Sequence, residues 1–146
     1  HVYVMDRKSG EQKVFEADSR FTKNVVEKCE SGNYEQWERH NIENPHFYDL
    51  MYLPQTGMYA RLHLGGIEFD ATRDILNLMD DRDLYLTFFD KDFVVVGEAK
   101  LPSHRYNYFT GWMETNDGVA LFVDNSLDEN EKTEELVLDI VRLQAD

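Results

Sequence analysis

Residues 84–98 decide the fold: Leu84-Tyr85-Leu86-Thr87-Phe88-Phe89, then Asp90-Lys91-Asp92, then Phe93-Val94-Val95-Val96-Gly97-Glu98. Two runs of β-branched and aromatic residues flank a short polar turn, which is the pattern of a β-hairpin. Both runs are apolar at successive positions, whereas a strand with one face in water alternates between apolar and polar residues. We therefore expect the sheet that contains this hairpin to be covered on both faces.

The same strand–turn–strand pattern recurs along the chain. Hairpins are expected at 1–15, 47–64, 84–98 and 108–124, and a last strand is expected at 136–143. The turn Pro54-Gln55-Thr56-Gly57 suits a hairpin because proline presets φ and glycine accepts a positive φ. The first and third hairpins both run from a Tyr-containing strand to an Asp-led turn, which indicates a weak internal repeat.

Sheets stacked face to face satisfy this pattern, because the sequence has no long helix to cover the strands. A β-sandwich needs Greek-key crossings that the short turns do not suggest, whereas four-stranded propeller blades need none. We expect an all-β chain of antiparallel blades, the incomplete C-terminal part of a six- to seven-bladed β-propeller. Its parts would be the outer hairpin of one blade (1–22), a complete blade (45–102) and three strands of a last blade (106–146). The remaining blades would belong to a longer chain, or the chain would self-associate.

Two long segments, 22–44 and 65–83, do not fit the strand pattern. The first is expected to be a loop with a helical turn near 35–40. The second is expected to be a loop in which Ile75, Leu76, Leu78 and Met79 form one short amphipathic helix. Loops on a rigid scaffold often carry function, so we expect these two segments to form the contact surface.

The charge of the chain argues against several partners. Fifteen Lys and Arg stand against 29 Asp and Glu, a net charge of -14, and the basic residues are scattered beside acids. We therefore expect no nucleic acid and no anionic membrane as partner. Cys29 is the single cysteine, which excludes an intrachain disulfide and a zinc site built on several thiolates. No apolar run approaches the roughly 18 residues of a transmembrane helix, so no transmembrane segment is expected.

No catalytic or metal-binding motif stands out. The histidines His40, His46, His63 and His104 lack the i, i+4 spacing of a metal site. The acidic segment 124–135 has Glu129 where a calcium-binding EF-hand loop needs glycine. Cys29 with His40 suggests a nucleophile and base only by proximity in the sequence, which is no evidence for a catalytic pair. We expect no catalytic residue, no metal and no cofactor, and favour a non-enzymatic protein.

A set of blade-pattern residues matches a known family. The set is Tyr48-Asp49, Tyr52, Tyr59-Ala60-Arg61, Leu86 to Phe93, Gly97-Glu98, Leu101-Pro102 and Asn116-Asp117-Gly118. With these residues, most of the chain from Phe47 onward resembles the C-terminal part of an uncharacterised family of Bacteroidetes β-propeller lipoproteins, a domain of unknown function. The resemblance implies an exported protein, lipid-anchored at the cell envelope. It implies no established activity and no catalytic residues.

Aromatic residues near strand ends and turns are the remaining candidates for function. Packing between blades accounts for most of them, but aromatic faces beside an arginine can also bind a sugar or a peptide. For such a site we expect Arg61, Tyr59, Trp37 and Trp112 to contact the ligand. The sequence thus favours a recognition or binding module with a glycan or protein ligand. The alternatives are a glycan-acting hydrolase, whose paired acids the sequence does not identify, and a structural scaffold without a ligand.

Overall fold

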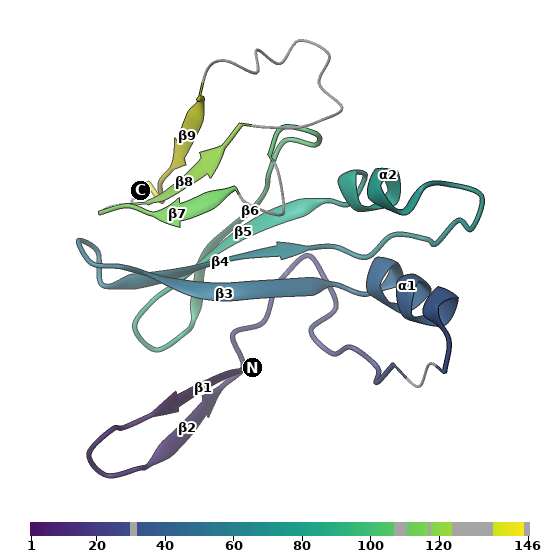
Figure 1. The fold of residues 1–146 in the computed structure, drawn as a ribbon. Helices are drawn as coiled ribbons and strands as arrows, with labels where there is room; N and C mark the ends of the chain where they lie inside the picture. The colour runs from purple at the N-terminus through teal and green to yellow at the C-terminus, as the bar shows by residue number, and fades with distance from the viewer. Residues whose placement is uncertain (30–31, 107–110, 117, 124–135, 145–146) are drawn as a thin grey trace.

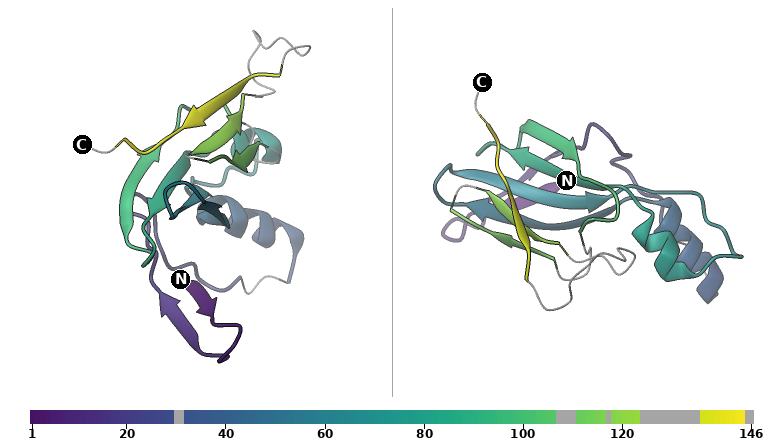
Figure 2. Two further views of the ribbon diagram at one scale, coloured as in Figure 1. Left: turned by 90° about the vertical axis from the view of Figure 1, so that its left-hand side faces the viewer. Right: turned by 90° about the horizontal axis from the view of Figure 1, so that it is seen from above.

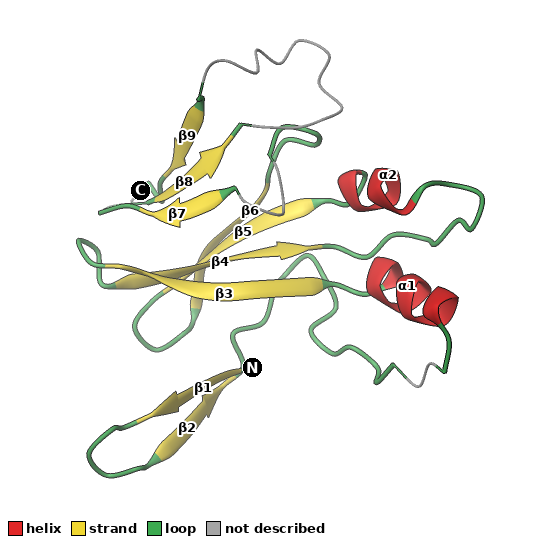
Figure 3. Ribbon diagram, in the orientation of Figure 1, coloured by secondary structure: helices red, strands yellow, loops and turns green. Residues whose placement is uncertain are grey.

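A computed structural model describes residues 1–29, 32–106, 111–116, 118–123 and 136–144. These residues form mainly β-strands, with two short helices (Figure 3). The strands are β1 (Val2–Met5), β2 (Gln12–Phe15), β3 (His46–Leu53), β4 (Met58–Leu64), β5 (Leu84–Phe89), β6 (Val95–Lys100), β7 (Trp112–Glu114), β8 (Val119–Phe122) and β9 (Leu138–Val141). The helices are α1 (Tyr34–Glu43) and α2 (Ile75–Asp80). In the described part of the chain, neither helix is long and apolar enough to cross a membrane.

The strands form three antiparallel sheets in chain order: β1-β2, β3-β4-β5-β6 and β7-β8-β9. Figure 1 shows them as successive layers, with the four-stranded central sheet between the other two. The layers do not close into a ring in any of the views (Figures 1 and 2). The mainly β, antiparallel architecture expected from the sequence is therefore confirmed.

The central sheet is covered on both faces, as the hairpin at 84–98 predicts. All six residues of β5 are buried. On one face, Leu62 and Leu86 pack in a core with Val119 and Leu121 of β8. On the other face, a smaller core forms around Phe89, with partly buried residues of the β1-β2 hairpin packed against it. Burying each large apolar side chain of these cores contributes about 1.5–3 kcal/mol.

The strap, defined here as residues 17–22, crosses the face of the central sheet that the β1-β2 hairpin also covers. Arg61 Nη2 donates to the Ala17 carbonyl at 2.7 Å, and the Arg20 backbone N–H donates to Glu98 Oε2 at 2.7 Å. The ring of Phe21 stacks on that of Tyr85, with centroids 5.4 Å apart. Ala17 has a φ of 47°, a region that residues other than glycine rarely adopt. The strap is thus fixed by side chains of the sheet beneath it.

Two local expectations were wrong in their bounds. The strand expected from Phe93 begins at Val95 instead, because Phe93 has a φ of 60° and belongs to the turn. The helical turn expected near 35–40 is a helix of 10 residues that begins after Asn33. The other strand pairs and the short helix at 75–80 form as expected. Residues 107–110 of the last hairpin and the acidic segment 124–135 lie outside the described residues.

The two end sheets expose apolar side chains on the faces that point away from the central sheet. Tyr3, Met5 and Val14 are exposed on the β1-β2 hairpin, and Met113 and Ile140 are exposed on the β7–β9 sheet. Adjacent exposed apolar side chains of this kind favour contact with another sheet or another molecule.

We expect the isolated chain to self-associate through these faces, so that light scattering gives a mass above the 17.2 kDa of one chain. Ile140→Lys should lower the measured mass, because it places a charge in the exposed apolar face of the β7–β9 sheet. Val94→Lys is the matched control, since Val94 is exposed but lies in the β5–β6 turn. A stable wild-type monomer would contradict the expectation.

Candidate functional site

The two helices lie together at one end of the central sheet, next to the start of β3 (Figures 1 and 2). Each helix begins at a side-chain cap that satisfies a free backbone N–H of the first turn. Asn33 Oδ1 accepts from the Gln36 N–H at 2.8 Å in α1, and Asp74 Oδ1 accepts from the Leu76 N–H at 2.8 Å in α2. The segments 22–44 and 65–83 thus meet at this end of the molecule.

Arg82 connects the two segments at this end of the molecule. The side chain is buried, with 4% of the residue exposed. Its guanidinium donates to three backbone carbonyls: Nε to Gly65 at 2.7 Å, Nη1 to Asn41 at 3.0 Å and Nη2 to Asn44 at 2.7 Å. Asn41 and Asn44 belong to the C-terminal end of α1, where backbone carbonyls lack partners within the helix. Arg82 therefore fixes α1 to the segment that follows β4.

One face of α1 exposes a pair of aromatic rings. Tyr34 and Trp37 stack with centroids 5.7 Å apart and an angle of 28° between the ring planes. Tyr34 is 70% exposed and Trp37 is 49% exposed. The negative charge of Glu38, and its hydrogen bond with the Tyr34 hydroxyl, raise the pKa of Tyr34. This face offers two stacked rings and a carboxylate on a helix that Arg82 anchors.

A hollow of about 660 Å³ lies against another face of α1, opposite residues 23–29. Both Cys29 and His40 line it. Among the described residues, no hydrogen bond joins the two side chains; the His40 ring instead lies 3.4 Å from Asn44 Nδ2. The two residues therefore share a hollow without forming a nucleophile–base pair.

A polar cluster lies beneath the strap. Arg61, His63, Thr87 and Glu98 share the face of the central sheet that the strap covers, because Arg61 pairs with Thr87 and Thr87 pairs with Glu98. Glu98 Oε1 accepts from Thr87 Oγ1 at 2.9 Å and lies 3.8 Å from His63 Nε2. The Arg61 guanidinium lies over the Phe47 and Phe89 rings, 4.5 and 5.1 Å from their centroids. In the described part of the chain, both ring nitrogens of His63 lack a hydrogen-bond partner.

The surroundings keep His63 neutral. Burial lowers the pKa of its imidazole to about 4; the Glu98 carboxylate opposes this shift and the Arg61 charge adds to it. His63 is also stacked between the rings of Phe47 and Tyr85, at 5.1 and 5.0 Å between centroids. Burial lowers the pKa of Arg61 as well, against the attraction of Glu98 and Asp18. The cluster is a buried structural element of the sheet face.

The four ligand-binding residues expected from the sequence lie in three places. Arg61 and Tyr59 share one face of β4, where Arg61 is 6% exposed and Tyr59 stacks on Phe93 at 4.7 Å. Trp37 lies on the exposed face of α1. Trp112 is half-buried in β7 and packs against Tyr48 at 4.5 Å. The structure therefore brings these four residues to no common site.

The sequence interpretation assigned no functional role to Tyr34, Arg82 or Glu98. Tyr34 had a local signal, because it stands three residues before Trp37 directly after a capping Asn33. Arg82 and Glu98 had none, since their partners lie far away in the sequence. Among the described residues, no group of three or more His, Cys, Asp and Glu is placed to hold a metal ion.

The fold is similar to that of a known protein. A crystal structure of a member of the DUF4221 family from Bacteroides vulgatus matches with a TM-score of 0.59 and 17% sequence identity. The match covers 73% of this chain and 30% of that chain. No family model matches the sequence, and no curated protein matches it significantly. The structural likeness supports a relation in fold to a Bacteroides domain of unknown function.

Arg82→Met should destabilise the protein by about 3 kcal/mol, because three backbone carbonyls, one buried and two part-buried, lose a charged donor. Urea unfolding followed by circular dichroism measures this change. Arg73→Met is the matched control: Arg73 pairs with Asp81 on the surface, and such a pair contributes at most about 1 kcal/mol. Equal effects of the two substitutions would contradict the anchoring role of Arg82.

His63 should make the protein less stable in mild acid. The unfolded imidazole binds a proton below pH 6.5, whereas the folded imidazole binds one only near its pKa of about 4. Stability is therefore lost as the pH falls from 6.5 towards 4, by about 3 kcal/mol over that range. His63→Phe should remove most of this loss, as seen in urea unfolding at pH 7 and pH 4.5. His104→Asn, which replaces a histidine at the surface, is the matched control.

Proposed function

We propose that this chain is part of a β-propeller and acts as a non-enzymatic recognition module at the bacterial cell envelope. The exposed aromatic face of α1, made of Tyr34, Trp37 and Glu38, is its contact surface, and a glycan is its ligand.

The arrangement of the sheets supports the propeller part of the proposal. The central sheet has four antiparallel strands in chain order, and the sheets before and after it pack on its two faces. Successive blades of a propeller pack in this manner. The apolar outer faces of both end sheets suit contact with further blades. Residues 1–22, 45–102 and 106–146 would then belong to three successive blades.

The envelope location rests on the resemblance of blade-pattern residues to Bacteroidetes lipoproteins. A structural neighbour from Bacteroides is compatible with that origin. At 17% sequence identity, the neighbour is evidence for a similar fold alone.

The stacked pair of Tyr34 and Trp37 is the observation that carries the binding proposal. Large aromatic side chains usually bury their rings, so two adjacent rings in water are unusual. Aromatic rings bind the apolar C–H face of a sugar, while a neighbouring carboxylate can accept hydrogen bonds from its hydroxyl groups. Glu38 provides such a carboxylate. The capped helix and the Arg82 contacts hold these groups in place before a ligand binds.

The geometry favours recognition over hydrolysis of glycans. A glycosidase needs two carboxyl groups that face each other, one of them with a raised pKa. Glu98 has a buried side chain, but it accepts from Thr87 and Arg20 and faces His63.

Trp37→Ala should weaken glycan binding at least about tenfold, as expected for an exposed aromatic anchor. Affinity gel electrophoresis with soluble starch, xylan, glucomannan and mucin glycans would identify a ligand that retards the wild-type chain and then compare variants. Tyr3→Ala is the matched control, because Tyr3 is exposed on the β1-β2 hairpin, away from α1.

Equal retardation of the wild-type chain and the Trp37→Ala variant would reject α1 as the contact surface. If none of the polysaccharides retards the wild-type chain, the proposal of a glycan ligand is rejected. Retention of a protein partner on immobilised wild-type chain but not on the Trp37→Ala chain would indicate a protein ligand instead.

A further inference from the structure

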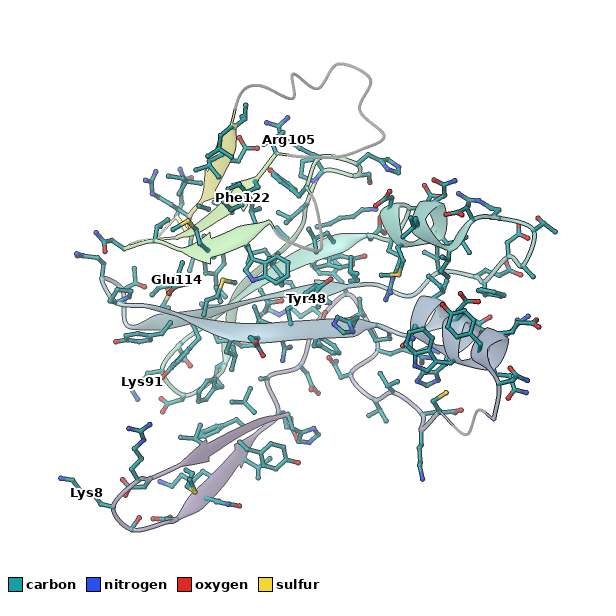
Figure 4. All side chains as sticks on the ribbon, viewed as in Figure 1. Lys8, Tyr48, Lys91, Arg105, Glu114 and Phe122 are labelled. Carbon is teal, nitrogen blue, oxygen red and sulfur yellow. The ribbon has the colours of Figure 1, made fainter. Side chains whose placement is uncertain are left out.

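A groove separate from the helix end runs between two sheets. Its walls are residues 49–52 and Pro54 on the side of β3, and Trp112 and Glu114 on the side of β7, and its volume is about 500 Å³. β3 and β7 are each the first strand of their sheet, so each presents one edge to this space. Figure 4 shows Tyr48 and Glu114 in the space between the two strands.

The walls of the groove are held in position by direct contacts. The Gln55 N–H in the β3–β4 turn donates to the Asn116 carbonyl in the β7–β8 turn at 3.0 Å. The Trp112 ring packs against that of Tyr48, with centroids 4.5 Å apart. The register of β3 shifts between Phe47 and Leu50, and Asp49 within this irregular stretch is exposed. The groove therefore exists without a ligand to shape it.

The charged side chains that line the groove are all acidic. Two carboxylates, Asp49 and Glu114, line the groove together with Trp112 and apolar side chains, and among the described residues no Lys, Arg or His lines it. Among the described residues, neither carboxylate forms an ion pair or a hydrogen bond. A site with carboxylates and aromatic faces suits a flat cation, because guanidinium groups bind carboxylates and stack on rings.

We propose that this groove binds an arginine-bearing peptide segment. The guanidinium group lies against Trp112 and pairs with Asp49 and Glu114. The net charge of -14 attracts such a segment over a longer range. The proposal is independent of glycan binding at α1, since the two surfaces share no residue.

Isothermal titration calorimetry with the 146-residue chain tests the proposal. The probe is acetylated, amidated tetra-arginine in 0.15 M NaCl, where the screening length is about 8 Å. Tetra-citrulline, which has the same shape without charge, is the control ligand. We expect tetra-arginine to bind and tetra-citrulline not to bind. The double variant Asp49→Asn, Glu114→Gln should raise the Kd at least tenfold.

The matched control variant is Glu11→Gln, Glu68→Gln, which changes the net charge by the same amount at exposed positions away from the groove. It should change the Kd less than twofold. Equal weakening by both double variants would show attraction to the overall charge and overturn the proposal, as would the absence of tetra-arginine binding to the wild-type chain. Trp37→Ala should leave tetra-arginine binding unchanged, which separates this test from that of the glycan site.

Discussion

The burial of β5 on both faces is the constraint on which the rest of the structure depends. A strand that carries leucine, phenylalanine and tyrosine on both sides needs a layer on each face of its sheet. The two layers differ in kind. The β7–β9 sheet covers one face with an apolar core, whereas the other face also holds Arg61, His63 and Glu98. The polar groups explain why the strap, and not another strand, covers part of that face: its backbone supplies a carbonyl to Arg61 and an N–H to Glu98.

Backbone groups also bind a buried side chain at the helix end, where Arg82 donates to carbonyl oxygens instead of a carboxylate. A buried charge is stable when each of its donors has a good acceptor. Arg82 finds three carbonyls, two of them in the C-terminal end of α1. These contacts fix the C-terminal end of the helix, whose first turns carry the exposed rings. The proposed contact surface therefore depends on a residue that does not belong to it.

The sequence predicted what depends on local pattern and missed what depends on distant contacts. The strands of the central sheet follow from runs of β-formers and turn residues, and their double burial follows from the lack of alternation. The start of α1 could have been predicted as well, from Asn33 at the cap and Gln36 three residues later. Arg61 shows the limit: its place on β4 was predictable, but the strap that covers it starts 44 residues earlier in the chain. The sequence could not show whether the Trp37 ring is exposed or packed between blades, since an aromatic residue suits both environments.

The acidic charge of the chain restricts what the two proposed surfaces can bind. With a net charge of -14, an anionic partner is repelled before it reaches either surface, unless local cations offset the field. The α1 face carries rings and a carboxylate, which suits a neutral sugar, and the groove carries rings and two carboxylates, which suits a cation. β3 connects the two places, since its first residue follows α1 closely and its later residues line the groove. The ladder of β3 with β4 therefore links the two proposed surfaces through one strand.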